Sequence, residues 1–159
     1  MITRNIDVAK QWLISKARGG ESLGLTTSSG AHRLKLYGIH VKSKIEPKTW
    51  FLNSNRDVRS AGFLEEVATE FDIQGLELDW TCIAWDANLR IENGLWKYKN
   101  FRGTERQNIK SEINKRYLLN AYRVLLTRAR QGMVIFIPEG DKSDRTRMPE
   151  FYDPVLHYF

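Results

Sequence analysis

The carboxyl-terminal part of the chain contains a nearly continuous apolar run, Met133–Ile137, which ends at Pro138. A short run that is apolar at almost every position is typical of a strand covered on both faces of a parallel sheet. Leu78–Trp85 is the strongest strand candidate, and Leu23–Thr27 and Val67–Thr69 are shorter ones. Because buried strands of this kind need a layer on each face, the pattern predicts an α/β fold.

Segments with helical spacing lie between these runs. Ile6–Ala17 repeats apolar residues at helical intervals, Ala31–Tyr37 has helical character, and the pattern is helical again over Ile109–Arg130. We expect Gln131-Gly132 to cap this last helix and Trp50–Leu52 to form a further short strand. The alternation of strands and helices predicts a three-layer domain with a mostly parallel central sheet.

Length and composition fit one ordered domain. A chain of 159 residues typically buries about 70% of its unfolded surface, so it needs no disulfide, and Cys82 has no second cysteine to pair with. No apolar run is long enough for a transmembrane helix, and no signal-peptide pattern opens the sequence, which favours the cytoplasm and no membrane partner. We expect a helix within residues 1–20 and one domain over residues 21–159.

Positive charge is concentrated in one part of the sequence. The whole chain has a formal net charge of +6, whereas Lys97–Arg130 alone carries ten basic residues and two acidic ones. Such a segment favours a polyanionic partner. Just before it, Asn93-Gly94 lies between two alternating runs and predicts a β-hairpin. The basic and aromatic stretch Trp96–Arg102 either tracks a nucleic-acid strand or forms a half-buried strand of this hairpin.

Two further stretches carry groups suited to nucleotide chemistry. In Thr69–Asp79, a glycine lets the backbone approach a phosphate, and a carboxylate can accept hydrogen bonds from ribose hydroxyls. In Asn120–Arg130, the arginines offer planar, permanently charged donors that match phosphate oxygens. Each stretch also has an ordinary explanation: a tight turn with solvated acids in the first, and compensation of the helix dipole in the second.

Together and in this order, the two stretches resemble motifs V and VI of superfamily 1 helicases of the UvrD and Rep kind. Thr69, Gly75 and Leu76-Glu77 match the motif V pattern of threonine, five residues and glycine-leucine-glutamate, and Leu126–Arg130 reproduces the centre of motif VI. A closer resemblance, over roughly Leu23–Tyr152, is to the helicase-like family of uncharacterised function related to Schlafen proteins. It is carried by Ser28–Ala31, Trp50–Leu52, Asp57–Ser60 and Asn120–Arg123.

The resemblance implies a second RecA-like helicase domain, with motif IV in residues 23–37, motif V in 69–79, a basic hairpin insertion in 88–110 and motif VI in 120–130. Arg128 would be the arginine finger on the γ-phosphate of ATP, Glu77 would meet the ribose, and Gly75 would lie near the phosphates. The other implied nucleotide contacts are Gln74, Arg123 and Arg130. Thr69 would touch the backbone of single-stranded DNA or RNA, with Ser28 and Ser29 as further candidate contacts. The basic stretch described above adds Lys97, Lys99 and Arg102 as candidate contacts.

The sequence departs from the helicase pattern in three places. The tyrosine that the family usually has four residues before the motif VI threonine is Arg123 here, with Tyr122 one position earlier. Thr26–Ser29 replaces the arginine of motif IV, and Arg33 follows only several residues later. No Gly-x-x-x-x-Gly-Lys-Ser/Thr loop and no acidic metal-positioning motif occurs, so ATP with Mg²⁺ would have to be shared with an upstream P-loop domain of the same protein. We therefore expect this chain to be part of a longer protein and not to hydrolyse ATP alone.

Two other classes of function remain open. One is a metal-dependent nuclease built on Glu65, Glu70, Glu77 and Asp79, although no lysine stands where such sites need one. The other is a non-catalytic nucleic-acid-binding module that uses only the basic segment. A zinc site is not expected, because the three histidines, His32, His40 and His157, lack ligand spacing.

Overall fold

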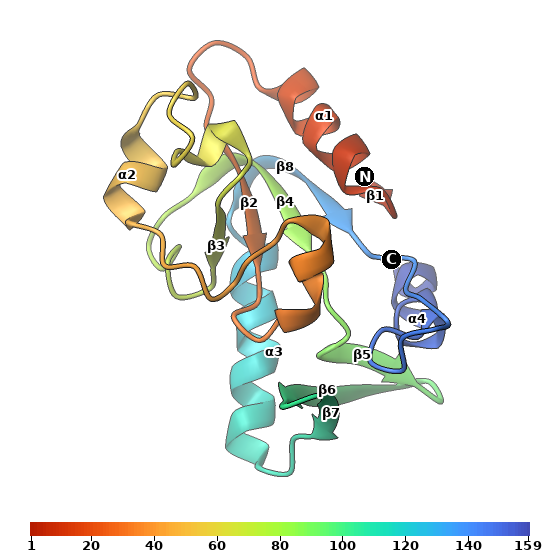
Figure 1. Cartoon of the computed structure of the whole chain (residues 1–159). Helices are drawn as coiled ribbons and strands as arrows, with labels where there is room; N and C mark the ends of the chain where they lie inside the picture. The colour runs from red at the N-terminus through yellow and green to blue at the C-terminus, as the bar shows by residue number, and fades with distance from the viewer.

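The computed structural model describes all 159 residues and is built around a five-stranded sheet (Figure 1). The strands run in the order β1 (Ile2–Thr3), β8 (Ala129–Phe136), β4 (Leu78–Ala84), β2 (Leu23–Thr27) and β3 (Val67–Thr69). Every neighbouring pair is parallel, which confirms the predicted sheet. Because Thr27 pairs with both Thr69 and Ala84, and Ala84 pairs with Phe136, the carboxyl ends of four strands share one edge.

Helices cover both faces of this sheet, as a three-layer fold requires (Figure 1). The two long helices are α1 (Ile6–Lys16) and α3 (Glu112–Leu126). Leu13 of α1 belongs to the same core cluster as Cys82, whereas Tyr122 of α3 belongs to the cluster around Ile83. Successive residues of β4 therefore point into different halves of the core, as the alternation of a strand dictates. The helix predicted within residues 1–20 is an integral layer of the domain.

The prediction of a helix over Ile109–Arg130 is wrong at its carboxyl end, because α3 stops at Leu126. Arg130 and the predicted cap, Gln131-Gly132, instead lie in β8 and extend its pairing with β4. The glycine is needed there for packing, since a Cβ at Gly132 would lie 2.7 Å from the ring of Trp80. A partner strand far away in the sequence thus overrides the local helical periodicity.

A second sheet, antiparallel and three-stranded, follows the carboxyl end of β4 (Figure 1). It consists of β5 (Leu89–Glu92), β6 (Leu95–Arg102) and β7 (Glu105–Asn108). Asn93 and Gly94 form the first turn with φ of 52° and 74°, which confirms the predicted hairpin. Trp96 and Tyr98 pack against the main core, so these two rings serve the structure rather than base stacking.

The prediction of a strand at Trp50–Leu52 is wrong, because these residues end a short helix, α2 (Pro47–Leu52). Glu46 caps this helix by accepting from the N–H of Thr49 at 2.7 Å, and proline is favoured in a first helical turn. Three apolar residues alone do not distinguish a strand from a buried helical turn.

The remaining elements lie at the periphery. They are α4 (Asp153–Tyr158) and three 3₁₀ helices, His32–Tyr37, Ala61–Phe63 and Pro149–Phe151. No helix of the chain has both the length and the apolar character needed to cross a bilayer.

Candidate nucleotide and nucleic-acid site

The residues singled out from the sequence lie at the two opposite ends of the parallel strands, which we call the amino edge and the carboxyl edge of the sheet. Residues 127–130, which we call the arginine turn, contain Arg128 and Arg130 and lie at the start of β8. Glu77 lies beside them, directly before the start of β4. Ser28, Ser29 and Thr69 lie at the carboxyl ends of β2 and β3. The helix α3 runs back from the second edge to the first (Figure 1).

The backbone fixes the arginine turn against the motif V segment. The N–H of Leu78 donates to the carbonyl oxygen of Arg128 at 3.0 Å, and Leu78 is in register with Ala129. Nε of Arg130 lies 4.0 Å from Oε2 of Glu77, and more than half of each side chain is exposed. An exposed pair at this distance contributes little stability. The pairing of β4 with β8 therefore places the exposed Glu77 and Arg130 beside the partly buried Arg128.

The surroundings of the arginine turn are open. Gly75 has a φ of 79°, and nothing lies within 4 Å of the position that a Cβ would occupy, so a ligand can approach this backbone closely. Arg123 is exposed on α3, where it donates to Oδ1 of Asn120 at 3.2 Å. Nε of Arg128 is buried without a hydrogen-bond partner, which is uncommon for a charged donor.

The four carboxylates of the nuclease hypothesis do not gather. Glu65 lies 3.4 Å from Nζ of Lys10, and Glu70 lies at the carboxyl end of β3. Asp79 lies near the amino end of β4, where the backbone N–H of Ser22 holds its pKa below the ordinary value. No three histidine, cysteine, aspartate or glutamate side chains are grouped as metal ligands. The geometry offers a metal-dependent nuclease no cluster of acids.

At the carboxyl edge, hydroxyl groups are turned toward neighbouring loops. The N–H and Oγ of Ser29 both donate to the carboxylate of Glu70 at 2.7 Å. The N–H and Oγ1 of Thr69 both donate to Oδ2 of Asp72, at 2.8 and 2.6 Å. Because Thr69 is also buried, its hydroxyl would have to rotate to meet a phosphate. Ser29 remains partly exposed.

Arg33, the arginine nearest to the motif IV position, also lies at the carboxyl edge. Its Nη2 lies 2.5 Å from Oδ2 of Asp144. It therefore has a carboxylate partner at the edge of the sheet opposite to the arginine turn, and the arginine turn does not gain a further cation from it.

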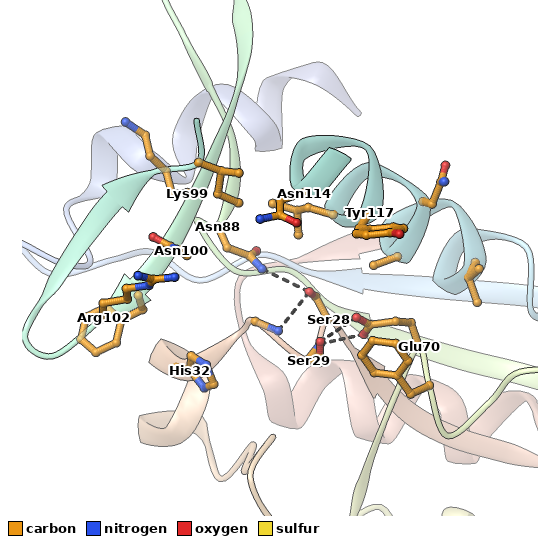
Figure 2. A pocket seen from close by; sticks show the side chains of 18 of the residues that line it. Ser28, Ser29, His32, Glu70, Asn88, Lys99, Asn100, Arg102, Asn114 and Tyr117 are labelled. Carbon is orange, nitrogen blue, oxygen red and sulfur yellow. Dashed lines mark hydrogen bonds between the residues drawn. The ribbon is translucent and has the colours of Figure 1, made fainter. Parts of the chain in front are cut away.

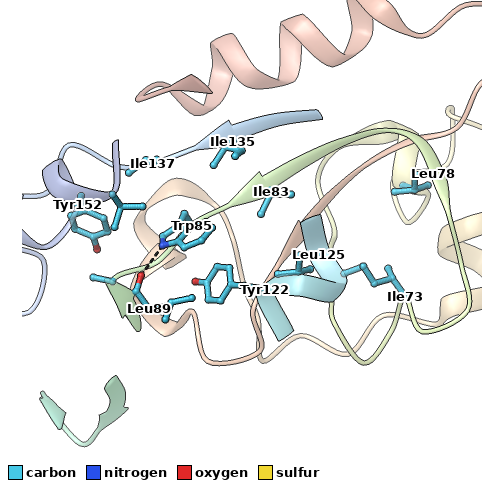
Figure 3. Close-up of a cluster of buried hydrophobic side chains, with 14 of the residues drawn as sticks. Ile73, Leu78, Ile83, Trp85, Leu89, Tyr122, Leu125, Ile135, Ile137 and Tyr152 are labelled. Carbon is cyan, nitrogen blue, oxygen red and sulfur yellow. Dashed lines mark hydrogen bonds between the residues drawn. The ribbon is translucent and has the colours of Figure 1, made fainter. Parts of the chain in front are cut away.

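A cavity of about 550 Å³, which we call the α3 groove, opens beside Ser28 and Ser29 (Figure 2). Its walls come from the loops after β2 and β3, from β6 and from α3. The polar and aromatic residues that line it include Ser28, Ser29, Glu70, Phe71, Gln74, Asn88, Lys99, Arg102, Asn114 and Tyr117. Four of the predicted nucleic-acid contacts thus lie together, and Gln74 lies with them rather than at the arginine turn.

The cations of the basic segment are not equivalent. Nζ of Lys99 lies 2.6 Å from Oδ1 of Asn108 and 3.4 Å from Glu92, and only 12% of the Lys99 side chain is exposed. Arg102 is exposed at the rim of the α3 groove. Lys97 lines a separate hollow beside Glu92. Of the three, Arg102 is the cation most available to a ligand in the groove.

Two exposed aromatic rings line the α3 groove that sequence reasoning missed. Tyr117 is 66% exposed and Phe71 is 68% exposed. Helical periodicity places Tyr117 on the apolar face of its helix together with Tyr122 and Leu125, but only the latter two are buried. The amino-terminal half of α3 extends beyond the sheet (Figure 1). A helical pattern carries no information about where the sheet that covers it ends.

A buried polar network beneath the groove ties the second sheet to the end of β4. Oδ1 of the fully buried Asp86 accepts from Nη2 of Arg106 at 2.6 Å and from the hydroxyl of Tyr152 at 3.2 Å. Burial opposes the charge of Arg106, but Asp86 holds the pKa of Arg106 above its ordinary value. Burial raises the pKa of Tyr122, whose hydroxyl donates to Asn88 at 2.6 Å. The feature of the sequence that could have indicated this network is Asp86, an aspartate that directly follows an apolar run.

One comparison with known proteins gives a match. A family model described as Schlafen group 3, DNA/RNA helicase domain matches residues 1–139, a range that includes the arginine turn, the second sheet and the α3 groove. No curated protein and no solved structure matches the chain.

Proposed function

The chain belongs to the Schlafen group 3 DNA/RNA helicase family, and from this premise we propose that it is the second RecA-like domain of an ATP-dependent helicase or translocase. One observation carries the proposal. Strand pairing holds Glu77 and the arginine turn together at an open surface, although motif V and motif VI are far apart in the sequence. The two ordinary explanations of these stretches, a tight turn and compensation of the helix dipole, do not require Glu77 and the arginine turn to lie side by side.

Arg128 has the chemistry of an arginine finger. Its guanidinium would stabilise the negative charge that develops on the γ-phosphate, and its buried Nε still lacks an acceptor. Glu77 would accept hydrogen bonds from the ribose, and the open backbone at Gly75 would lie near the phosphates. Arg123 and Arg130 would support Arg128 from either side.

ATP with Mg²⁺ would be bound chiefly by an upstream P-loop domain of the same protein, because this sequence contains no P-loop of its own. Single-stranded DNA or RNA would run along the carboxyl edge of the sheet, where the basic segment and the α3 groove lie. The family description, a DNA/RNA helicase domain, supports nucleic acid as the partner.

The test measures ATP hydrolysis by the protein together with its P-loop domain, with and without a single strand. We expect Arg128→Ala to lower the stimulated rate by roughly 10³- to 10⁵-fold, the range known for arginine fingers. Arg18→Ala, which removes an exposed arginine outside both motifs, is the control, and we expect it to keep the rate. A near-normal rate in Arg128→Ala would rule out the assignment. Strand binding without any stimulated hydrolysis in the unaltered protein would favour a non-catalytic binding module.

A further inference from the structure

On the α3 side of the groove, the exposed ring of Tyr117 is flanked by uncharged asparagine side chains, and from this we infer that the groove binds one unstacked nucleobase of a single strand, with Tyr117 as the stacking platform. The inference rests on the proposed contact with nucleic acid and adds which part of the strand enters the protein. It assigns a role to Tyr117 and Asn114, which lie outside motifs V and VI.

The aromatic component comes from Tyr117 and Phe71. Both rings line the groove and both are about two-thirds exposed, at 66% and 68%. A large ring left this exposed within a cavity has an apolar face available to a ligand, and bases stack on such faces whatever their identity. The cavity of about 550 Å³ lies in the roughly 300–1,000 Å³ range of small-ligand pockets.

Amide side chains flank the ring. Asn114 and Asn120 lie one helical turn before and after Tyr117, so all three share one face of α3 and all line the groove. The backbone N–H of Asn114 donates to Oγ of Ser111, but its side-chain amide makes no hydrogen bond within the chain, and the side chain of Asn120 uses only its oxygen, toward Arg123. Amides offer both a donor and an acceptor, which is the pattern that the edge of a base presents.

The charge distribution decides which part of a nucleotide enters. Glu70 lies on the groove wall next to Ser29, and Figure 2 shows it across the cavity from Asn114 and Tyr117. A carboxylate there repels a phosphate but tolerates an uncharged base. Arg102 is exposed at the rim, where it can meet the strand's backbone. The arrangement therefore fits a base inside and phosphates outside.

The experiment compares two fluorescent single strands of equal length, one of thymidine nucleotides and one with abasic sugars throughout. We expect the protein to bind the thymidine strand more tightly than the abasic strand. Tyr117→Ala should weaken binding of the thymidine strand by roughly 5- to 100-fold, the cost of removing one base–aromatic stack, and leave the abasic strand unaffected. Tyr117→Phe keeps the ring and should bind like the unaltered protein.

Ile113→Ala is the matched control, because Ile113 is 64% exposed one turn earlier on the same helix and does not line the groove. Unchanged thymidine binding in Tyr117→Ala, an equal loss for both strands, or an equal loss in Ile113→Ala would each overturn the inference, as would failure of the unaltered protein to bind either strand. The hydrolysis defect of Arg128→Ala is measured in protein that keeps Tyr117, so it tests the proposed function separately.

Discussion

The two edges of the parallel sheet use their charged residues in opposite ways. At the arginine turn, Glu77 and Arg130 are more than half exposed and only 4.0 Å apart. Beneath the α3 groove, Asp86 and Arg106 are 0% and 4% exposed and form a 2.6 Å pair. The exposed charges are free to meet a ligand, whereas the buried ones hold the second sheet in place. The charges of the arginine turn are therefore available to a ligand, whereas the buried pair stabilises the domain, and substitutions can test this contrast.

The largest expected effect is on catalysis at the arginine turn. Arg128→Lys keeps the positive charge but loses the planar fork that matches phosphate oxygens, so we expect the strand-stimulated hydrolysis rate to fall at least roughly 100-fold. Thermal unfolding of the same variant should stay within a few degrees of the unaltered protein. A large loss of stability here would show that the two edges are not distinct.

The second prediction concerns stability at the groove edge. Arg106→Met leaves Asp86 buried without its cation, and we expect the free energy of unfolding to drop by about 3–5 kcal/mol in urea denaturation. Arg145→Ala is the matched control, because Arg145 pairs with Glu105 of the same strand, β7, at an exposed position. Its cost should be at most about 1 kcal/mol. Equal costs for the two variants would contradict the contrast between the edges.

The third prediction separates nucleotide binding from folding. Glu77→Gln removes an exposed, weak ion pair, so the unfolding free energy should change by less than about 1 kcal/mol. If Glu77 meets the ribose, the KM for ATP should rise roughly tenfold, the worth of one charge-assisted hydrogen bond. Steady-state kinetics decide the point, and an unchanged KM removes Glu77 from the nucleotide site.

The smallest effect concerns pH. Burial, reinforced by the nearby positive charge of Lys42, lowers the pKa of His32 below its ordinary value near 6.5. The folded chain thus favours neutral His32, whose contribution to stability is complete above that ordinary value and falls as the pH drops below it. Because the side chain is only partly buried, we expect a loss of about a few tenths of a kcal/mol. His32→Asn should remove this part of the difference between pH 7.5 and pH 5 in urea denaturation.

Local sequence patterns were sufficient for most strands of the parallel sheet and for the hairpin turn, although the pattern at Trp50–Leu52 predicted a strand where a helix forms. Four of the five strands in the parallel sheet are apolar or β-branched runs bounded by polar residues, and Asn93-Gly94 has the positive φ values that its turn requires. The two-residue strand β1 is too short to show a pattern, and the polar strand β7 has no alternation to detect. The end of α3 was missed because β4, not the helix, determines the conformation of Ala129 onward.

The candidate site was predicted in part, for a related reason. The motif resemblance identified the arginine turn, since its residues are defined by type and order along the chain. The α3 groove depends on where α3 extends beyond the sheet, so neither Tyr117 nor Asn114 could be assigned to it from periodicity. Arg106 and Asp86 belong to different strands and share no local pattern, and only the fold places them together.

The helix α3 has a mechanical consequence for any protein that contains this domain. Its 15 residues form a helix about 22 Å long that carries Tyr117 in its amino-terminal half and connects directly to the arginine turn at its carboxyl end. If ATP bound at the arginine turn displaces α3, the affinity of the protein for ATP and its affinity for a strand in the α3 groove become linked. Thermodynamic reciprocity then requires that each ligand change the affinity of the other by the same factor.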